Sequence, residues 1–333
     1  MRNASKGICK KSVAFLLACL LFLLPPLLLH ATAADSTYIK WVDFTVTAKA
    51  LKDAAAVDIA SHAEANKPIS WIDLLAALGQ KYGGDFSMYR KKDLDTFVAA
   101  AKSGGIEGSI QNERLFRYYQ EAYGAVLGGM IGHYCEERQD ENGSITITEQ
   151  YGLKAFHPLA TGYSYAHTDD FGNARSYGYK RRHLGHDMFG SVGTPVIAME
   201  SGYVEALGWN QYGGWRIGIR SFDGKRYYYY AHLRKDHPYT DLYEGKIVSA
   251  GEVIGYLGMT GYSAKENANN LKKPHLHVGL ELIFDPAQKD GYCQIWVSMY
   301  ELVNFLADRR VRTYHVNGEA TSRIRIIDAE MPD

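Results

Sequence analysis

The pattern of hydrophobic and polar positions divides the chain into two parts of different character. Residues 35–140 carry apolar and aromatic residues near helical spacing, in stretches with few glycines or prolines. After Tyr151 the pattern changes to short apolar runs separated by Gly, Pro and Asp-Gly, which is typical of β-strands with close turns. The residues between these two parts are polar and charged, so we expect a linker at 141–150.

The N-terminal part predicts a small helical domain, assigned to residues 35–140. Ser70 is a good N-cap residue and Asp73 follows three positions later, as at the start of many helices. The expected helices span 49–64, a segment opened at Ser70, 93–102 and 112–131. We find no motif of catalytic or metal-binding residues in these segments, so we assign no chemistry to this domain.

The C-terminal part predicts an antiparallel β domain over residues 151–290, because its short strands follow one another without intervening helices. Asp223-Gly224 is a strong signal for a hairpin turn. Residues 294–309 have the pattern of a helix, so we expect 291–333 to form a C-terminal helix and tail. The fold class expected for the whole chain is therefore α+β.

An apolar segment at the N-terminus predicts export across a membrane. Residues 1–34 combine a positively charged start, an apolar run from Val13 to Leu29 and a small-residue site at Ala31-Thr32-Ala33, as in a secretory signal peptide. The apolar run is near the lower length limit for spanning a bilayer, so an N-terminal membrane anchor stays open as the alternative. Either interpretation places the rest of the chain outside the cytoplasm.

The charge balance argues against a strongly basic nucleic-acid binder. The chain has 37 Lys and Arg against 37 Asp and Glu, a net charge of zero. Cleavage after Ala33 removes the four basic residues of the leader, which leaves a mildly acidic chain. We therefore expect no nucleic acid among the partners.

The cysteines indicate no metal site of their own. Beyond the leader the sequence has only Cys135 and Cys293, which lack the CxxC spacing of a cysteine zinc site. We interpret them as buried free thiols, and one disulfide in an exported protein stays open as the alternative.

Four histidines and one aspartate in the β part have a spacing that suits a metal site. Residues two or four apart in a strand point to the same face, so His183 is expected beside Asp187 and His275 beside His277. His232 follows a Tyr-rich strand. A catalytic zinc keeps three protein ligands and one open position. His183, Asp187 and one of His275 and His277 would supply that set, which leaves two histidines for proton transfer or for stabilising an oxyanion.

The order of these motifs resembles the lysostaphin-type (LytM-like) zinc metalloendopeptidases, over residues 155–285. The motifs are His-x-Gly-x-Asp at 183–187, Tyr-x-His-Leu at 230–233, the Gly-rich run 251–261 and His-Leu-His at 275–277. The resemblance implies an antiparallel β-sheet peptidase domain of lysostaphin type, here preceded by the helical domain and followed by the C-terminal helix.

The resemblance also implies roles for individual residues. His183, Asp187 and His277 match the ligands of a Zn²⁺ ion, and His232 and His275 match the two catalytic histidines. The segment 263–273 is longer and more polar than is common in the family, and we expect it to border the cleft.

The resemblance and the leader together predict an exported zinc-dependent endopeptidase that hydrolyses peptide bonds in bacterial peptidoglycan. Because the chain has no HExxH glutamate, we expect a histidine to act as general base toward a zinc-activated water, and the spacing does not distinguish His232 from His275. The expected location is the cell wall or the outer face of the cytoplasmic membrane. Two alternatives on the same fold are a non-enzymatic cell-wall binding or assembly protein and a zinc peptidase that acts on a Gly-rich protein.

Overall fold

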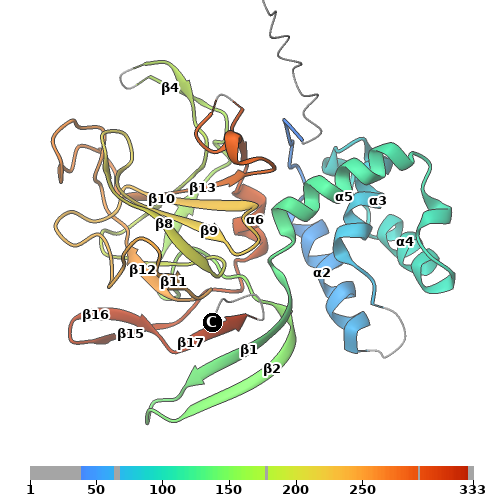
Figure 1. Cartoon of the computed structure of the whole chain (residues 1–333), viewed down its shortest axis with the longest axis horizontal. Coiled ribbons are helices and arrows are strands. Elements are labelled where there is room, and N and C mark those ends of the chain that lie inside the picture. The colour runs from blue at the N-terminus through green and yellow to red at the C-terminus, as the bar shows by residue number, and fades with distance from the viewer. Residues whose placement is uncertain (1–38, 64–67, 177–178, 292, 329–333) are drawn as a thin grey trace, which may run out of the picture. The chain divides into compact units, whose positions relative to one another are not determined.

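Helices α2 to α5 make up the N-terminal part of the chain as the structure describes it (Figure 1). The structure is a computed structural model that describes residues 39–63, 68–176, 179–291 and 293–328. The leader expected at 1–34 lies outside these residues, and within them no helix is long and apolar enough to cross a membrane. The helical elements are α2 (Ala48–Ala63), α3 (Trp71–Tyr82), η1 (Phe86–Met88), α4 (Lys91–Ser103), η2 (Glu107–Ser109) and α5 (Glu113–Leu127).

The start of α3 agrees with the prediction from its sequence. Ser70 has an extended backbone, and its hydroxyl oxygen accepts a hydrogen bond from the Asp73 N–H at 3.3 Å. This bond satisfies one of the N–H groups that have no partner within the first turn of a helix. The helix ends at Gly83, whose φ of 62° lies in the left-handed region that favours glycine.

We expect Ser70→Ala to lower the free energy of unfolding by about 1 kcal/mol, because the Asp73 N–H loses its partner. Urea unfolding followed by circular dichroism measures this change. Ser103→Ala is the control, since Ser103 is exposed in the last turn of α4, and we expect it to change stability by less than about 0.5 kcal/mol. Equal effects of the two substitutions would contradict the capping role of Ser70.

The C-terminal part is built on an antiparallel sheet of eight strands among the described residues. The strands run in the order β11-β8-β9-β10-β13-β6-β3, and β14 pairs with β13. Alternation along β10 buries Tyr228 and Tyr230 in the core and turns Tyr227 and Tyr229 to the opposite face. In chain order the strands are β3 (Tyr165–His167), β6 (His186–Gly190), β8 (Gly202–Asn210), β9 (Gly214–Ser221), β10 (Arg226–Ala231), β11 (Ile247–Val248), β13 (His275–Leu282) and β14 (Ile295–Val297).

The remaining strands form smaller antiparallel sheets. The sheet β17-β1-β2 has three strands, and the pairs β7 with β12, β15 with β16 and β4 with β5 have two each in the described part of the chain. Their bounds are β1 (Ile131–Gln139), β2 (Ile145–Leu153), β4 (Ala174–Arg175), β5 (Arg181–Arg182), β7 (Pro195–Ile197), β12 (Val253–Tyr256), β15 (Thr313–Val316), β16 (Glu319–Ser322) and β17 (Ile324–Asp328). Together with the helices they confirm the expected α+β class.

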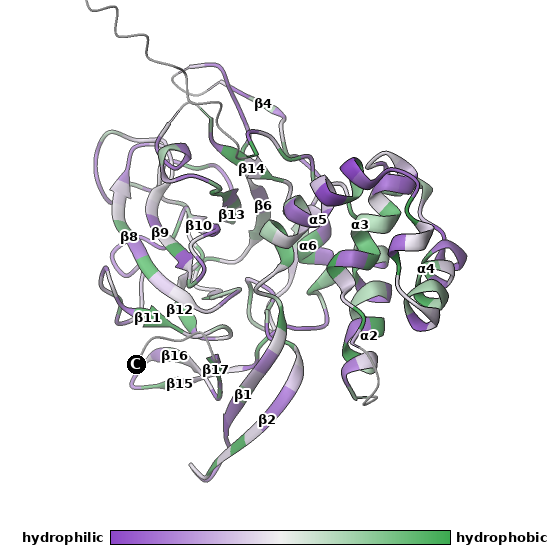
Figure 2. Cartoon of the chain, turned by 45° about the vertical axis from the view of Figure 1, so that its right-hand side comes forward, coloured by the Kyte–Doolittle hydropathy of each residue, from purple (hydrophilic) through white to green (hydrophobic). Residues whose placement is uncertain are grey.

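The segment expected as a linker at 141–150 is instead part of a β-hairpin. The Asp140 carboxylate accepts hydrogen bonds from the Asn142 and Ser144 N–H groups, both at 2.8 Å, and this turn joins β1 to β2. Polar residues run along both strands (purple in Figure 2), and Ile145 and Ile147 are exposed. The hairpin looks like a linker in the sequence because its outer half has no buried face. The domain boundaries themselves stay a prediction.

The C-terminal helix is shorter than its sequence pattern indicates. Residues 295–297 form β14, which pairs with β13 and places Trp296 opposite Glu281. Helix α6 therefore spans only Tyr300–Phe305. The two cysteines are free thiols, as expected, but Cys293 is exposed and Cys135 is half-buried, so our interpretation of both as buried was wrong.

A buried ion network joins the helices to the sheet. The Arg226 side chain on β10 is 1% exposed and donates to both Glu200 carboxylate oxygens, at 2.8 and 2.9 Å. It also donates to the Ala125 carbonyl in α5 at 2.9 Å, while the Tyr228 hydroxyl donates to Glu200 at 2.8 Å. Since the apolar core also runs from α2 to α6 without interruption, the described residues from Ile39 onward form one compact unit.

Candidate metal centre

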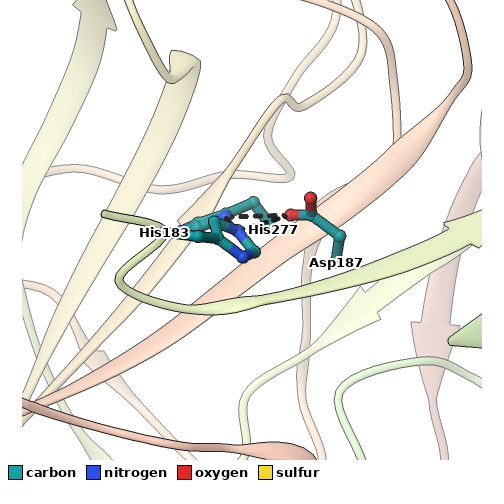
Figure 3. Close-up of side chains that lie close together, drawn as sticks. All are labelled: His183, Asp187 and His277. Atoms are coloured by element: carbon teal, nitrogen blue, oxygen red, sulfur yellow. Dashed lines mark hydrogen bonds and ion pairs between the residues drawn. The ribbon is translucent and has the colours of Figure 1, made fainter. Parts of the chain in front are cut away.

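Two neighbouring strands bring an aspartate and a histidine together. Asp187 on β6 and His277 on β13 are direct partners in the antiparallel register, and such partners have Cβ atoms about 4.5–5.5 Å apart. His183 lies four residues before Asp187, in the segment between β5 and β6. The three side chains point toward one another, although His183 and His277 are 94 residues apart in the sequence (Figure 3).

Three ligand atoms converge in this cluster. His183 Nε2, Asp187 Oδ1 and His277 Nδ1 lie 3.0 Å from one another in every pairing. Tetrahedral zinc ligands at 2.0–2.1 Å from the ion lie about 3.3 Å apart, so the three atoms need to move apart by only about 0.3 Å to fit such an ion. The cluster is also the only group of three or more His, Cys, Asp or Glu residues suited to a metal among the described residues. These three residues can therefore hold a metal ion.

Second partners fix the orientation of the ligands. His183 Nδ1 faces Asp170, at 3.1 Å from a carboxylate oxygen and 3.2 Å from the carbonyl, which leaves Nε2 free for a metal. Arg175 donates to Asp170 at 2.7 Å and to Asp187 at 3.2 Å. Burial disfavours the charged form of His183, but the hydrogen bonds to both carboxylates outweigh it and raise the pKa of His183 to about 9. Burial favours the neutral form of Asp187, but the hydrogen bonds with His183 and His277 outweigh it and hold the pKa of this carboxyl far below its ordinary value.

Gly185 leaves space for the third ligand. A Cβ at this position would overlap the imidazole ring of His277 and lie 3.0 Å from the Val278 carbonyl. Because both neighbours belong to β13, neither can move without disturbing the pairing of β13 with β6. The glycine between His183 and Asp187 is therefore part of the geometry of the centre.

We expect Gly185→Ala to weaken the affinity for a divalent metal about 10–100-fold, because the added methyl group displaces the His277 ring. Competition with a chromophoric chelator measures the affinity. Gly132→Ala is the matched control, since a Cβ there meets only Lys154 atoms at ordinary contact distances of 3.5 and 3.6 Å. Unchanged metal affinity in folded Gly185→Ala would contradict this role.

His232 and His275 lie beside the cluster. Their ring centroids are 4.7 Å apart, and His275 Nε2 is 3.7 Å from Asp187 Oδ1. His232 Nδ1 is bonded to the Thr260 carbonyl at 2.9 Å, and His275 Nδ1 to the Lys273 carbonyl at 3.0 Å. Since a carbonyl only accepts, Nδ1 carries the proton in both rings and Nε2 is left as the acceptor. Burial, helped by the nearby His275 and His277, lowers the pKa of His232 well below its ordinary value.

All five side chains predicted from the sequence thus lie together, and the other histidines of the described part of the chain do not join them. His186 is adjacent to Asp187 on β6, so its side chain is expected on the opposite face of the strand from the ligands. It is buried and hydrogen-bonded to His167 at 2.8 Å. Burial lowers the pKa of His186 to about 4, which suits a neutral packing residue.

A cleft of about 610 Å³ contains the centre and includes residues that the sequence did not single out. Its wall includes Arg181, whose guanidinium lies over the rings of Tyr212 and Tyr262, at 5.1 and 5.4 Å from their centroids. Tyr262 lines the cleft and directly precedes the segment 263–273, whose own place at the border of the cleft stays a prediction. In the sequence, only the glycine pair Gly213-Gly214, which indicates a turn beside Tyr212, could have drawn attention to this part of the cleft wall.

The fold and the cluster define a lysostaphin-type β domain with a site for a metal ion. A crystal structure from Ruminococcus gnavus, described as a candidate glycyl-glycine endopeptidase lytM, covers 83% of this chain and 93% of its own. The TM-score is 0.51 at 20% sequence identity, a likeness that concerns the fold alone.

Sequence comparisons identify the family of this domain. Residues 181–288 match the profile of Peptidase family M23. The L-Ala–D-Glu endopeptidase of Bacillus subtilis is 42% identical over 136 residues, which are 39% of this chain and 40% of that protein. Lysostaphin of Staphylococcus simulans is 41% identical over 96 residues, 28% of this chain and 17% of that protein. The chain therefore carries a peptidase family M23 domain, homologous to these endopeptidases, and it spans less than half the length of either relative.

Proposed function

We propose that this protein is an exported zinc-dependent endopeptidase that hydrolyses peptide bonds in bacterial peptidoglycan. The observation that carries the proposal is the convergence of His183, Asp187 and His277, with the Nε2 atoms of His232 and His275 beside them. The homologous endopeptidases support this class of reaction. The signal-like segment 1–34 supports export to the compartment that holds the polymer.

The three ligands suit zinc because two imidazoles and one carboxylate leave a fourth position open. When bound, zinc supplies a Lewis acid that polarises a carbonyl group and lowers the pKa of water toward neutrality. Asp170 keeps the proton of His183 on Nδ1, so that Nε2 stays available as a ligand.

The two remaining histidines handle the protons in the proposed reaction. Because Thr260 and Lys273 carbonyls hold the Nδ1 protons, each ring presents an unprotonated Nε2 as a base. One of the pair accepts the proton of the attacking water at Nε2, the resulting Nε2–H donates a hydrogen bond to the oxyanion, and the same proton then passes to the departing amine. The buried position of His232 keeps its ring neutral before the reaction.

Digestion of purified peptidoglycan tests the proposal. We expect the purified protein to release new amino groups, a chelator to stop the release, and added Zn²⁺ to restore it. Mass spectrometry of the released fragments then identifies the bond, whether in a peptide stem or in a cross-link. A protein that binds zinc and the polymer but releases no amino groups would instead support the alternative of a cell-wall binding or assembly protein.

A further inference from the structure

A buried carboxyl group without a hydrogen-bond partner lies in the cleft away from the metal centre. Glu281 on β13 is 1% exposed, lines the cleft, and its Oε1 has no partner among the described residues. Residues four apart on a strand share a face, so Glu281 points to the same side of the sheet as His277, roughly 13 Å farther along. Buried oxygens rarely lack a partner, so this atom needs an explanation.

The cations nearest to Glu281 are already paired with another acid. Arg220 donates to Glu205 at 2.6 and 3.1 Å, and Lys289 donates to Glu205 at 2.8 Å while its Nζ lies over the Tyr227 ring. Among the described residues neither of them forms an ion pair with Glu281. Burial therefore raises the pKa of the Glu281 carboxyl to about 8, despite the attraction of Lys289 and Arg220.

The floor between the metal centre and Glu281 is aromatic. Gly279 lies midway between His277 and Glu281 on the same face, and a Cβ there would be 2.7 Å from the Trp296 ring. The glycine thus lets the indole cover the strand, and Trp296 is also the cross-strand partner of Glu281. The Tyr229 ring meets Trp296 edge to face, with centroids 6.2 Å apart. A cation that moves along this floor passes over π-faces that attract it.

We propose that Glu281 is a substrate-binding residue that receives the side-chain ammonium group of a diamino acid in the peptide. An ammonium group carries three donors on a compact centre, which suits one unpartnered oxygen better than the flat, two-pronged guanidinium does. Each residue of an extended peptide spans at most about 3.3–3.6 Å, so the recognised residue lies within about four positions of the bond that is cleaved. This inference rests on the proposed function and specifies the substrate of the same cleft.

Matched peptides test the inference without any change in the protein. Stem peptides with a free side-chain amine are compared with the same peptides acetylated on that amine, using the full chain loaded with zinc. We expect kcat/KM to be at least about 10-fold higher for the free amine, since acetylation removes the charge. Equal kcat/KM for the two peptides would overturn the inference.

Substitution of Glu281 tests whether this residue causes the preference for the peptide with the free amine. We expect Glu281→Gln to abolish the preference, through a higher KM for the free-amine peptide, while the zinc content stays at the wild-type level. Glu266→Gln is the matched control, because Glu266 is exposed and is not among the residues that line the cleft, and we expect it to keep the preference. If Glu281→Gln slows both peptides equally, the carboxyl has only a structural role and the inference fails.

A binding measurement separates this inference from the proposed function. If the wild-type chain cleaves neither these peptides nor purified peptidoglycan, the proposed function fails, and calorimetry with the same two peptides then decides the role of Glu281. Tighter binding of the free amine, lost in Glu281→Gln, would support the subsite in a non-enzymatic protein. Equal binding of both peptides would overturn it.

Discussion

Replacing His277 with alanine is expected to lower kcat/KM on peptidoglycan peptides by at least about 10³-fold and to remove the bound zinc. The ligand set falls from three to two, and a metal contributes several kcal/mol of transition-state stabilisation, at 1.36 kcal/mol for each factor of ten. The loss also leaves Asp187 without one of its two imidazole partners. Zinc content by elemental mass spectrometry and peptide release from the polymer measure the two effects.

His237→Ala is the matched control for this substitution. His237 is half-exposed and pairs with Glu319 at 2.7 Å, so its removal leaves the cleft untouched. We expect wild-type zinc content and activity from this variant. A His277→Ala protein that still cleaves at the wild-type rate would exclude the proposed mechanism.

Replacing His232 or His275 with alanine is expected to lower kcat about 10²–10⁴-fold while zinc stays bound. The Nδ1 atom of each ring is bonded to a backbone carbonyl, and neither ring belongs to the set of three converging ligand atoms. The readout is therefore a pair of measurements on each variant, the zinc content and the single-turnover rate. This combination separates proton transfer from metal binding, which His277→Ala changes together.

His315→Ala is the control for this pair, because His315 is exposed on β15. We expect it to change neither quantity. Loss of zinc from His232→Ala or His275→Ala would show that these rings act as ligands or as supports of the ligands. Wild-type kcat in both variants would remove them from the mechanism.

The spacing of the histidines predicted the site because strand geometry has a period of two. It predicts that His275 and His277 share a face, but not which residue lies opposite them. The register that sets Asp187 across from His277 joins strands 90 residues apart, and no local pattern encodes it. The carbonyls that orient His232 and His275 belong to Thr260 and Lys273, which lie outside the named strands in segments whose conformation depends on the packing around them.

Two other features were hidden from the sequence for different reasons. The hairpin of β1 and β2 lacks a buried face over much of its length, so alternation of polar and apolar residues was too weak to predict it. Glu281 belongs to no motif, and a glutamate in a sequence gives no sign of burial. Its position became meaningful only when β13 was seen to continue four residues past His277 on the floor of the cleft.

The guanidinium of Arg226 couples the stability of the helices to the stability of the sheet that carries the metal centre. It neutralises Glu200 inside the molecule and at the same time closes the last turn of α5 at the Ala125 carbonyl. If α5 separated from the sheet, Arg226 would lose the Ala125 carbonyl as an acceptor while its guanidinium stayed buried. Leaving a buried donor without an acceptor costs free energy. The helices therefore stabilise the sheet that carries the metal centre, through this hydrogen bond and through the apolar core that they share with it.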